Sequence, residues 1–498
     1  MMTAPNTAGP SATGPSATGP NAAGFHSEGP LFQNRQRVYP KAVTGRFRRL
    51  KWLALSVLLA IYYITPWLRW DRGPGAADQA VLADMYGRRL YFFWLEIWPQ
   101  EIYFLTGVLV LAAIGLFMVT ALAGRVWCGF ACPQTVWTDL FMLVERWIEG
   151  DRAARMQRDR HPWTRTWITR KLAKHALWLL IALATGGAWI FYFYDAPTLV
   201  HDLTHGAAPV KTVFFLGLFT ATTYLLAGWA REQVCTYMCP WPRFQSAMLD
   251  EHSMIVTYEK WRGHQPMPLR KGQSWDQRQA AGGGDCIDCH QCIQVCPTGI
   301  DIRDGQQMEC IGCGLCIDAC NHIMATIGRP GDLITLDSEF NSMARATVQP
   351  TRSRLLRPRT VIYALILVII ASAMTVALAL RSSAELTILR DRAPLFVTQA
   401  DGLIRDSYTV KLINKTARDQ VFRLSLDGLP GARLILVGPD ESEQTALSLA
   451  ATADQVTTWH IRVRAPATGQ PETPITFEAS AGPIRLETRD MFAGPGHR

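Results

Sequence analysis

Five stretches of the sequence are apolar and long enough to cross a bilayer as helices, which takes about 20 residues. They cover residues 52–68, 102–122, 176–194, 213–229 and 361–380. Lys and Arg gather beside alternate ends of these stretches, in the segments 35–51, 146–174 and 352–359. Positive flanks stay on the cytoplasmic side of a membrane. The pattern therefore predicts a multi-pass membrane protein, with its amino end and residues 241–359 in the cytoplasm and the residues after 381 outside.

The segments between the spans carry weaker patterns. Residues 134–148 are amphipathic, but Asp139, Glu145 and Arg146 make a full span costly. We therefore expect a helix that lies at the membrane interface. The aromatic-rich stretch within residues 69–100 also predicts an interfacial segment.

Two further segments lack any pattern of regular structure. Residues 195–210 contain no Lys or Arg, and we expect an external loop there. Residues 1–34 are low in complexity and too polar to bury a core, which predicts a disordered tail.

Beyond the last apolar stretch the pattern changes to alternation with period two. Six short runs rich in β-branched residues occur at 408–415, 421–426, 433–437, 459–464, 475–479 and 484–488. Such runs, separated by turn residues, predict an antiparallel, immunoglobulin-like β-sandwich over residues 382–498. Nothing in it is typical of catalysis, so we interpret it as an interaction domain.

The net charge of +9 would suit a nucleic-acid partner, but the surplus lies beside the apolar spans. There it is a topology signal, so we expect the lipid bilayer as a partner and no nucleic acid.

Eight of the twelve cysteines form two C-x2-C-x2-C-x3-C runs. This spacing holds [4Fe–4S] clusters, and the fourth cysteine of each run ligates the other cluster. One predicted cluster is held by Cys286, Cys289, Cys292 and Cys320. The second is held by Cys310, Cys313, Cys316 and Cys296. A pair of structural zinc ribbons is the alternative, although zinc sites favour C-x2-C pairs separated by a longer loop.

Apolar residues separate these cysteines and are expected to shield the clusters from water. They are Ile287, Ile293, Val295, Ile311, Leu315 and Ile317. Pro297 follows the first run, whereas Asn321 follows the second, which leaves the local turn after Cys320 undetermined.

The other four cysteines form two C-x3-C-P motifs, Cys128 with Cys132 and Cys235 with Cys239. Each follows an apolar span, so the two regions look like a repeat. Positions i and i+4 share a helix face, so two neighbouring pairs would gather four thiolates at the membrane surface. Soft thiolates favour Cu(I), zinc or iron–sulfur. A copper site, a redox dithiol pair and a further cluster all stay open, beside plain buried cysteines, and we assign these four the catalytic role.

Histidines lie near both kinds of segment. His201 and His205 are spaced as i and i+4 but lack a third ligand, so we interpret them as loop histidines. His290 and His322 flank cluster cysteines and are expected to tune potentials by hydrogen bonding rather than to ligate.

Together these patterns predict a multi-domain membrane protein with an α-helical bundle, an inserted ferredoxin-like α+β module and an all-β sandwich. After the tail, a membrane domain with four spans and both C-x3-C-P motifs covers residues 35–240. The two-cluster module covers residues 241–359, the fifth span residues 360–381, and the sandwich the remainder.

Several longer motifs carry a resemblance to a known family. They are F-F-W-L-E-I-W-P-Q-E-I-Y, R-V-W-C-G-F-A-C-P-Q-T-V-W-T-D-L-F-M-L-V-E-R-W-I-E-G-D-R and C-T-Y-M-C-P-W-P-R-F-Q. With them the sequence resembles the FixG/CcoG family, accessory proteins of cbb3-type cytochrome c oxidase, over roughly residues 35–498.

The resemblance implies a bacterial inner-membrane protein with ferredoxin-type clusters that reduces Cu(II) and supplies Cu(I) during oxidase assembly. It implies copper as substrate, with oxidase assembly machinery and copper transporters as partners. It also carries the family's cluster cysteines onto the eight named above, and its membrane-edge cysteines onto the four of the C-x3-C-P motifs. The electron donor and the oligomeric state, a homo-oligomer included, stay open.

Two other functions compete with cupric reduction. One is a quinol-linked electron conduit of the NapH-like type, in which copper is incidental. The other is an oxidase-assembly scaffold, in which the sandwich docks a partner and the clusters only sense redox state.

Overall fold

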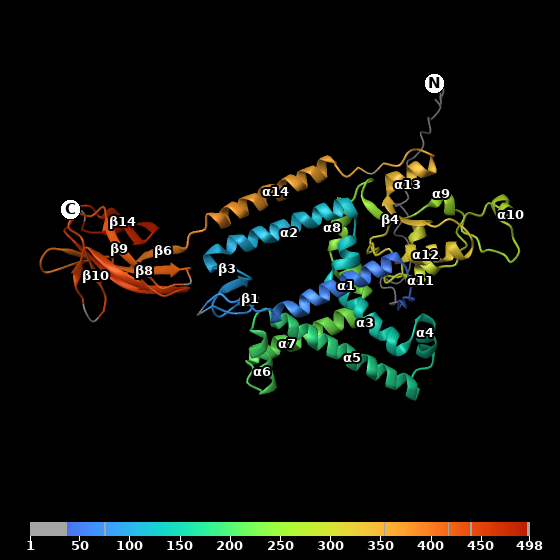
Figure 1. Cartoon of the computed structure of the whole chain (residues 1–498), viewed down its shortest axis with the longest axis horizontal. Coiled ribbons are helices and arrows are strands. Elements are labelled where there is room, and N and C mark those ends of the chain that lie inside the picture. The colour runs from blue at the N-terminus through green and yellow to red at the C-terminus, as the bar shows by residue number, and fades with distance from the viewer. Residues whose placement is uncertain (1–36, 74–75, 353, 417, 439–440, 496–498) are drawn as a thin grey trace, which may run out of the picture.

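The computed structural model describes residues 37–73, 76–352, 354–416, 418–438 and 441–495. The predicted disordered tail, residues 1–34, lies outside them. Long helices occupy the middle of an elongated molecule, with a β-sandwich at one end and a small mixed lobe at the other (Figure 1).

The five predicted spans are confirmed as helices that are long and apolar enough to cross a membrane. They are α1 (Arg46–Ile64), α2 (Ile102–Ala123), α5 (Arg165–Ile190), α7 (Val210–Thr223), which η4 (Tyr224–Ala230) continues, and α14 (Pro358–Ala379). Their surfaces expose many apolar side chains, and none of the most apolar window of α14 is buried. Lipid contact accounts for that exposure.

Helix α5 begins well before the predicted span, which started at residue 176. The side chain of Thr164 accepts a hydrogen bond from Trp167 N and caps the earlier start. Lys171 and Lys174 then lie on the helix, where carboxylates of a neighbouring helix pair with them. Hydropathy alone placed the helix too late because it counted these paired lysines as polar flank.

Helix α3 (Pro133–Glu149) contains the predicted amphipathic segment 134–148 and is not among the helices that are both long and apolar enough to span. Its carboxylates do not face a membrane surface, because Asp139, Glu145 and Glu149 are all buried. They pair with cations from α1, α4 (Arg152–Arg160) and α5.

Two interpretations of connecting segments were incomplete. The stretch within residues 69–100 forms a small antiparallel sheet of β1 (Val81–Asp84), β2 (Arg89–Phe92) and β3 (Leu95–Ile97). Strands this short give almost no periodic signal. The expected loop at residues 195–210 contains α6 (Ala196–Thr204), which Asp195 caps by accepting from Thr198 N.

The mixed lobe, which we name the cysteine lobe, spans residues 241–357. Strands β4 (Met254–Tyr258) and β5 (Ile334–Ser338) pair antiparallel beside the two cysteine runs. Helices α11 (Gln291–Val295) and α12 (Leu315–Thr326) each follow the first two cysteines of a run and contain the third. The remaining helices are α8 (Trp241–Met248), α9 (Lys260–Gly263), α10 (Trp275–Ala280), η6 (Ile302–Asp304) and α13 (Glu339–Ala346).

The sandwich has two antiparallel sheets around one apolar core. One sheet contains β6 (Ala384–Arg390), β7 (Val397–Thr398), β8 (Ile404–Asn414), β10 (Arg433–Leu436), β11 (Glu443–Gln444) and β13 (Gln455–Ala465). The other contains β9 (Gln420–Asp427), β12 (Ala446–Ala451), β14 (Glu472–Ala481) and β15 (Ile484–Ala493). Each of the six predicted runs corresponds to a strand, and the immunoglobulin-like expectation is confirmed.

The cysteine lobe joins the bundle through a helix cap supplied from a distance. Helix α1 has Gly45 before it and no side-chain cap of its own. The carboxylate of Asp318, on α12, accepts hydrogen bonds from Phe47 N (3.2 Å) and Arg48 N (2.8 Å). A Cβ at Gly45 would lie 2.2 Å from Asp318 Cγ, so glycine is required for this approach. A carboxylate at a helix N-terminus also meets the positive end of the helix dipole.

The sandwich is fastened at the opposite end of the bundle. Glu101, just before α2, is 2.8 Å from Arg381 and 2.7 Å from Lys415. Arg89, on β2, is 2.6 Å from Asp454 in the sandwich and 2.8 Å from Glu96 on β3.

Replacing Asp318 with alanine is expected to loosen the cysteine lobe, because the first turn of α1 loses its only side-chain acceptors. The loss should be about 1–2 kcal/mol, the usual worth of a helix cap. It would be measured as a lower thermal midpoint of the purified protein. Asp304→Ala, at an exposed carboxylate of the same lobe, is the control. Equal midpoints for the two variants would contradict the capping role.

The fastening of the sandwich should depend on pH through Glu96. Burial, reinforced by the neighbouring Asp454 carboxyl, raises the pKa of Glu96 to about 7 from its usual 4.5. The docked state therefore holds a proton that the undocked state has lost, so docking should weaken as pH rises from about 5 to about 8. Hydrogen exchange of β1–β3 at several pH values measures this. Glu96→Gln should flatten the dependence and Glu487→Gln, an exposed control, should not.

Candidate functional site

Four cysteines surround one small cavity in the cysteine lobe. Its wall contains Cys286, Cys289, Cys292 and Cys320, the set predicted to hold the first cluster. Three come from the loop before α11 and its first turn, and Cys320 comes from the middle of α12. Tyr258, Met324 and Leu333 close the cavity on its apolar side. The crossed pairing read from the spacing therefore agrees with where the chain places these side chains.

The second predicted set also converges. Burial raises the pKa of the Cys316 thiol, and the nearby thiols of Cys313, Cys310 and Cys296 raise it further. The pKa of the Cys320 thiol is raised to about 12, mainly by burial. The thiols that add to this rise are those of Cys292, Cys286 and Cys289. Each fourth cysteine thus has the three cysteines of the other run as its neighbours.

The helix α12 explains why asparagine follows Cys320. Cys296 ends α11, so Pro297 can follow it without loss of a helical hydrogen bond. Cys320 lies inside α12, which continues to Thr326, and proline at position 321 would break that helix. The Asn321 side chain instead exchanges two hydrogen bonds with Asp332 and fastens the loop that leads to β5.

The donor set fits iron–sulfur clusters. All twelve cysteines are free of disulfides. Val295, Ile311, Leu315 and Ile317 are buried beside the sulfur atoms, as predicted, while Ile287 and Ile293 are half-buried. Within the described residues, no three Cys, His, Asp or Glu side chains are grouped to hold a single metal ion. Which sulfur ligates which cluster stays a prediction.

The two C-x3-C-P motifs adopt matching backbones. In each, a π-helical turn precedes the second cysteine, η3 (Trp127–Ala131) in one and η5 (Val234–Met238) in the other. The wide turn closes with a hydrogen bond of 2.8 Å from Cys132 N to Trp127 O, and equally from Cys239 N to Val234 O. A new helix then begins at the proline after the second cysteine in one motif, Pro133 of α3, and directly after it in the other, where Pro240 is the N-cap of α8. The repeat seen in the sequence is therefore a structural repeat, although its turns are wider than the expected α-helix.

The four thiols of these motifs lie near enough to influence one another's ionisation, although no three of them in the described part of the chain are grouped tightly enough to hold one metal ion. Burial raises the pKa of Cys128 to about 12, and the neighbouring thiols, Cys132 first, add to the rise. Burial likewise raises the pKa of Cys235 to about 11, with contributions from Cys132 and Cys239. A soft cation bound among them would reverse this preference and hold them as thiolates. We name these four side chains the thiol quartet.

The thiol quartet packs directly against the second predicted cluster set. Cys128 and Cys235 contact the buried group that contains Cys313, Ile311 and Leu315. A Cβ at Gly129 would lie 3.0 Å from Ile311 O and 3.1 Å from Cys313 Cα, so the turn η3 touches the cluster loop itself.

Arg125 braces this contact, and sequence reasoning missed it. Its buried guanidinium donates to the carbonyls of Met308, Cys310 (2.9 Å) and Pro242 (3.0 Å). It therefore ties the end of α2 to the second cluster loop and to the helix after the second motif. A signal existed in the sequence, because each motif is preceded within four residues by an arginine, Arg125 or Arg231.

Other polar residues around the quartet were also missed. Gln245, fully buried, accepts a hydrogen bond from the Cys128 thiol at 3.2 Å. The buried amine of Lys51 pairs with Asp139 at 3.3 Å. Burial raises the pKa of both Cys313 and Cys235, and the positive charge of Lys51 opposes the rise at each. One lysine therefore lies near both thiol groups.

The candidate histidines lie away from the quartet. His201 and His205 stack with ring centres 4.2 Å apart, on α6 and directly after it. His290 is exposed at the rim of the first cavity, with Nδ1 3.0 Å from Arg303 Nη2. His322 is exposed on α12. Their predicted roles stay predictions.

These features define a membrane protein of the iron–sulfur class. Family models support this directly. One described as a 4Fe-4S dicluster domain matches residues 230–339, and one described as a 4Fe-4S binding domain matches residues 105–150. The latter includes Cys128 and Cys132. A third, described as an IG-like fold at the C-terminal of FixG, matches residues 374–495.

The chain is similar to three characterised sequences over most of its length. The nitrogen fixation protein FixG of Rhizobium meliloti is 45% identical over 493 residues, covering 93% of each chain. Protein RdxA of Cereibacter sphaeroides is 50% identical, covering 82% of this chain and 86% of RdxA. Protein RdxB of the same organism is 46% identical, covering 93% of this chain and 95% of RdxB. The chain belongs to the FixG family, an iron–sulfur oxidoreductase family, as its motifs predicted.

Two double variants test the crossed assignment of ligands. If Cys296 serves the cluster of the other run, Cys289→Ala with Cys296→Ala should abolish both clusters. Cys289→Ala with Cys320→Ala should abolish one and leave about four iron per chain. Iron and acid-labile sulfide in anaerobically purified protein measure the outcome. The opposite result, with the first pair leaving four iron and the second none, would show that each run holds its own cluster.

Proposed function

We propose that this protein reduces Cu(II) to Cu(I) at the thiol quartet, for delivery of Cu(I) during assembly of a cbb3-type cytochrome oxidase. The observation that carries the proposal is the contact between the quartet and the second cluster set through Cys128, Cys235 and Cys313. Iron–sulfur clusters supply electrons singly, which suits a one-electron reduction of a metal ion. Thiolates are soft ligands and favour the Cu(I) product.

The residues of the chain have distinct tasks in this scheme. The quartet binds copper through three half-buried thiols, Cys128, Cys132 and Cys235, and the exposed thiol of Cys239 leaves the site open to an incoming ion. Arg125 and Gly129 hold the quartet against the cluster loop, so that an electron crosses a short distance. The electron donor to the clusters stays open in this scheme.

We propose that this side is the cytoplasm and that the membrane is the bacterial inner membrane. The basic flanks of the spans support this orientation, since they lie at the end of the bundle that carries the cysteine lobe. The sandwich would then face the periplasm, where assembly factors and copper transporters are its proposed partners.

Serine at Cys235 and Cys239 is expected to abolish copper reduction while the clusters remain. Loss of metal-holding residues should cost at least about 100-fold in rate. Full-length protein, reduced anaerobically, would be mixed with Cu(II) and a Cu(I)-specific chelator, and visible absorbance would report the clusters. Tyr237→Phe, in the same turn and exposed, is the matched control. A double variant that reduces copper at the full rate would refute the assignment.

Metal analysis separates copper chemistry at the quartet from a further cluster there. About eight iron per chain leaves the quartet free for copper, whereas about twelve would place a third cluster on it. Rapid reduction of the clusters by a quinol, with slow copper turnover, would favour the electron-conduit function instead. If removal of residues 385–498 abolished oxidase assembly while copper reduction persisted, the scaffold function would gain.

A further inference from the structure

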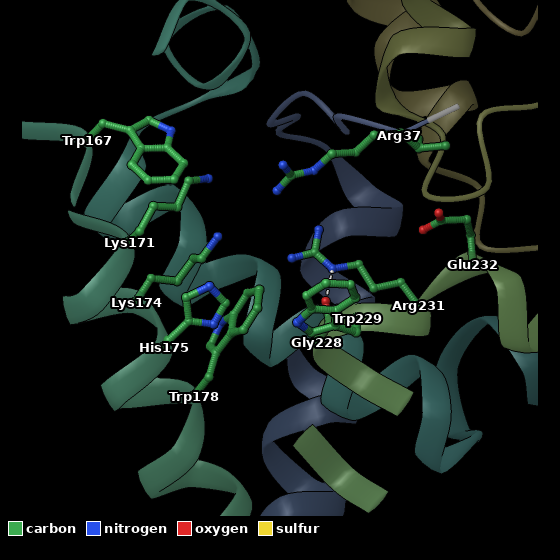
Figure 2. Close-up of a pocket in the computed structure, with 11 residues that line it drawn as sticks. Arg37, Trp167, Lys171, Lys174, His175, Trp178, Gly228, Trp229, Arg231 and Glu232 are labelled. Carbon is green, nitrogen blue, oxygen red and sulfur yellow. Dashed lines mark hydrogen bonds between the residues drawn. The ribbon is translucent and has the colours of Figure 1, made fainter. Parts of the chain in front are cut away.

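A cavity of about 460 Å³ lies where the first turns of α5 meet the end of η4 (Figure 2). This is the end of the bundle nearest the cysteine lobe, at the level where two spans end. The cavity wall combines the indoles of Trp167, Trp178 and Trp229 with a set of cations. These are Arg37, Lys171, Lys174 and Arg231. Tryptophan and basic residues are typical of the zone where lipid headgroups lie.

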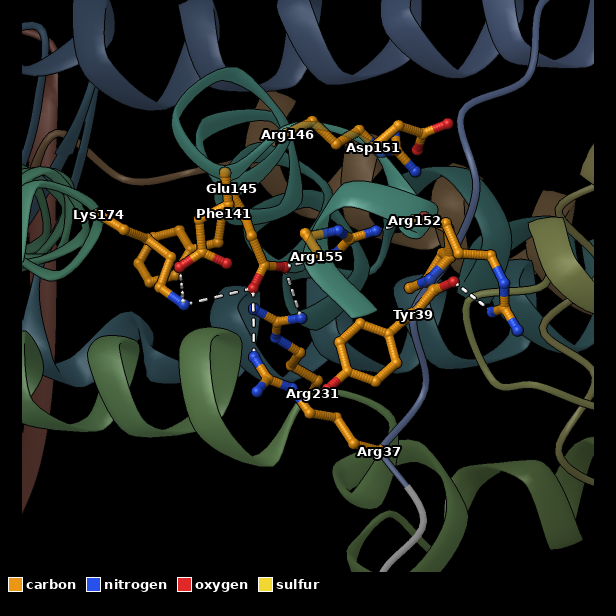
Figure 3. Close-up of polar contacts among 12 residues, drawn as sticks. Arg37, Tyr39, Phe141, Glu145, Arg146, Asp151, Arg152, Arg155, Lys174 and Arg231 are labelled. Carbon is orange, nitrogen blue, oxygen red and sulfur yellow. Dashed lines mark hydrogen bonds and ion pairs between the residues drawn. The ribbon is translucent and has the colours of Figure 1, made fainter. Parts of the chain in front are cut away.

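The cations are held in place from behind. Buried Glu145 lies 2.9 Å from Arg231 and 3.4 Å from Lys174, and it also pairs with Arg155 (Figure 3). Glu149 is 3.0 Å from Lys174 and 3.1 Å from Lys171. Neither carboxylate is part of the cavity wall. The acidic groups therefore orient the cations while the cavity itself is faced by their donors.

Hydrogen-bonding capacity remains on the cavity side. Arg231 donates a hydrogen bond from Nε to Gly228 O, and its Nη1 pairs with Glu145. Among the described residues, this leaves the Nη2 donors of Arg231 available to a ligand. The Arg37 side chain is 43% exposed, and the distance between its guanidinium and the Glu145 carboxylate is 3.4 Å, long for an ion pair. Glu232 is the one carboxylate in the wall; it has interactions of its own and lies apart from Lys171 and Lys174 in Figure 2.

The cluster of charged groups in and behind the cavity wall has a net positive charge. Five cations, the four in the wall and Arg155, meet four carboxylates, Glu145, Glu149, Asp159 and Glu232. The helices that frame the cavity also expose apolar side chains to the outside, including Leu172, Leu179 and Leu225. A ligand with an anionic head and an apolar tail satisfies both surfaces.

We propose that this cavity binds the phosphate headgroup of an anionic phospholipid. Basic pockets between membrane helices hold such headgroups, and arginine donates to phosphate oxygens in pairs. The indoles would pack against the glycerol and the upper acyl chains. Arg231 and Lys174 also form ion pairs with buried Glu145. A lipid bound here would therefore cover the cluster of charges through which α3, α4 and α5 pack together.

Binding of defined lipids to the detergent-purified full chain tests the proposal. Native mass spectrometry would count bound short-chain phosphatidylglycerol and phosphatidylcholine at matched concentrations. Phosphatidylglycerol should bind preferentially to the wild type. The double variant Arg37→Gln, Lys171→Gln should lower its apparent affinity about 25-fold, since each cation near an anionic headgroup contributes roughly a factor of five. Lys174 and Arg231 are kept, because their loss would strand buried Glu145.

The control removes two charges from the same end of the bundle without touching the cavity. Arg160→Gln with Arg165→Gln, both exposed, should leave phosphatidylglycerol binding unchanged. If inorganic phosphate displaced phosphatidylglycerol at concentrations like those of the lipid, the cavity would recognise phosphate, but its ligand would be the free anion rather than a lipid headgroup. Equal binding of the two lipids by the wild type would overturn the proposal, whether or not the variants fold. The proposal would also be overturned if a quinone analogue displaced the lipid from the wild type and its binding required Arg37 and Lys171.

Discussion

A buried guanidinium with no carboxylate bonded to it is the interaction on which this structure depends. Among the described residues, all hydrogen bonds of Arg125 go to backbone carbonyls, and these belong to two separate segments, the loop with Met308 and Cys310 and the helix with Pro242. Burying an unpaired charge is costly unless an opposite charge lies near. The nearest candidates are the thiols of Cys310 and Cys128, whose negative charge would stabilise Arg125. Deprotonation of these cysteines, which metal binding requires, would therefore also complete the electrostatics of the joint between the bundle and the cysteine lobe.

A second set of buried charges shapes the bundle itself. The acids of α3 are enclosed by cations from α1, α4, α5 and η4, so a helix too polar to span is held inside the protein. Removal of one member of such a set usually costs about 3–5 kcal/mol, because the partner is left buried and uncompensated. Burial of Glu145 by itself would raise the pKa of its carboxyl. The positive charges of Arg231 and Lys174 outweigh that effect and hold the pKa below its usual value. The basic runs thus also contribute to internal packing.

The sequence predicted the elements whose signals are local. The five spans follow from apolar length, and six strands of the sandwich follow from period-two alternation in runs such as residues 459–464. The spacing of the cysteine runs predicts which cysteines come together, and that grouping agrees with the positions of their side chains, although the ligation itself stays a prediction. Strands β1–β3 were not predictable in this way, because three or four residues give no period. Arg125 and Gln245 escaped notice because each acts through partners more than a hundred residues away. The early start of α5 was missed because a buried lysine looks identical to an exposed one in a hydropathy profile.

The wide turns of the two motifs also follow from packing rather than from propensity. A π-helical turn is rare and tends to occur at functional sites. Here it lets the chain pass from a span to a cross-running helix while both cysteines of a motif stay near their counterparts. Gly129 permits the closest approach, and no larger residue would fit without displacing the cluster loop.

Helix α2 connects the two working ends of the molecule. At one end Glu101 pairs with Arg381 and with Lys415 of the sandwich, and at the other end the chain passes through Arg125 into the turn that carries Cys128. An α-helix is stiff along its axis, and this one has no proline within it. If a partner docks on the sandwich, a displacement there would be transmitted along α2 to the turn that carries Cys128, so the proposed docking and the proposed copper chemistry would be mechanically coupled through one helix.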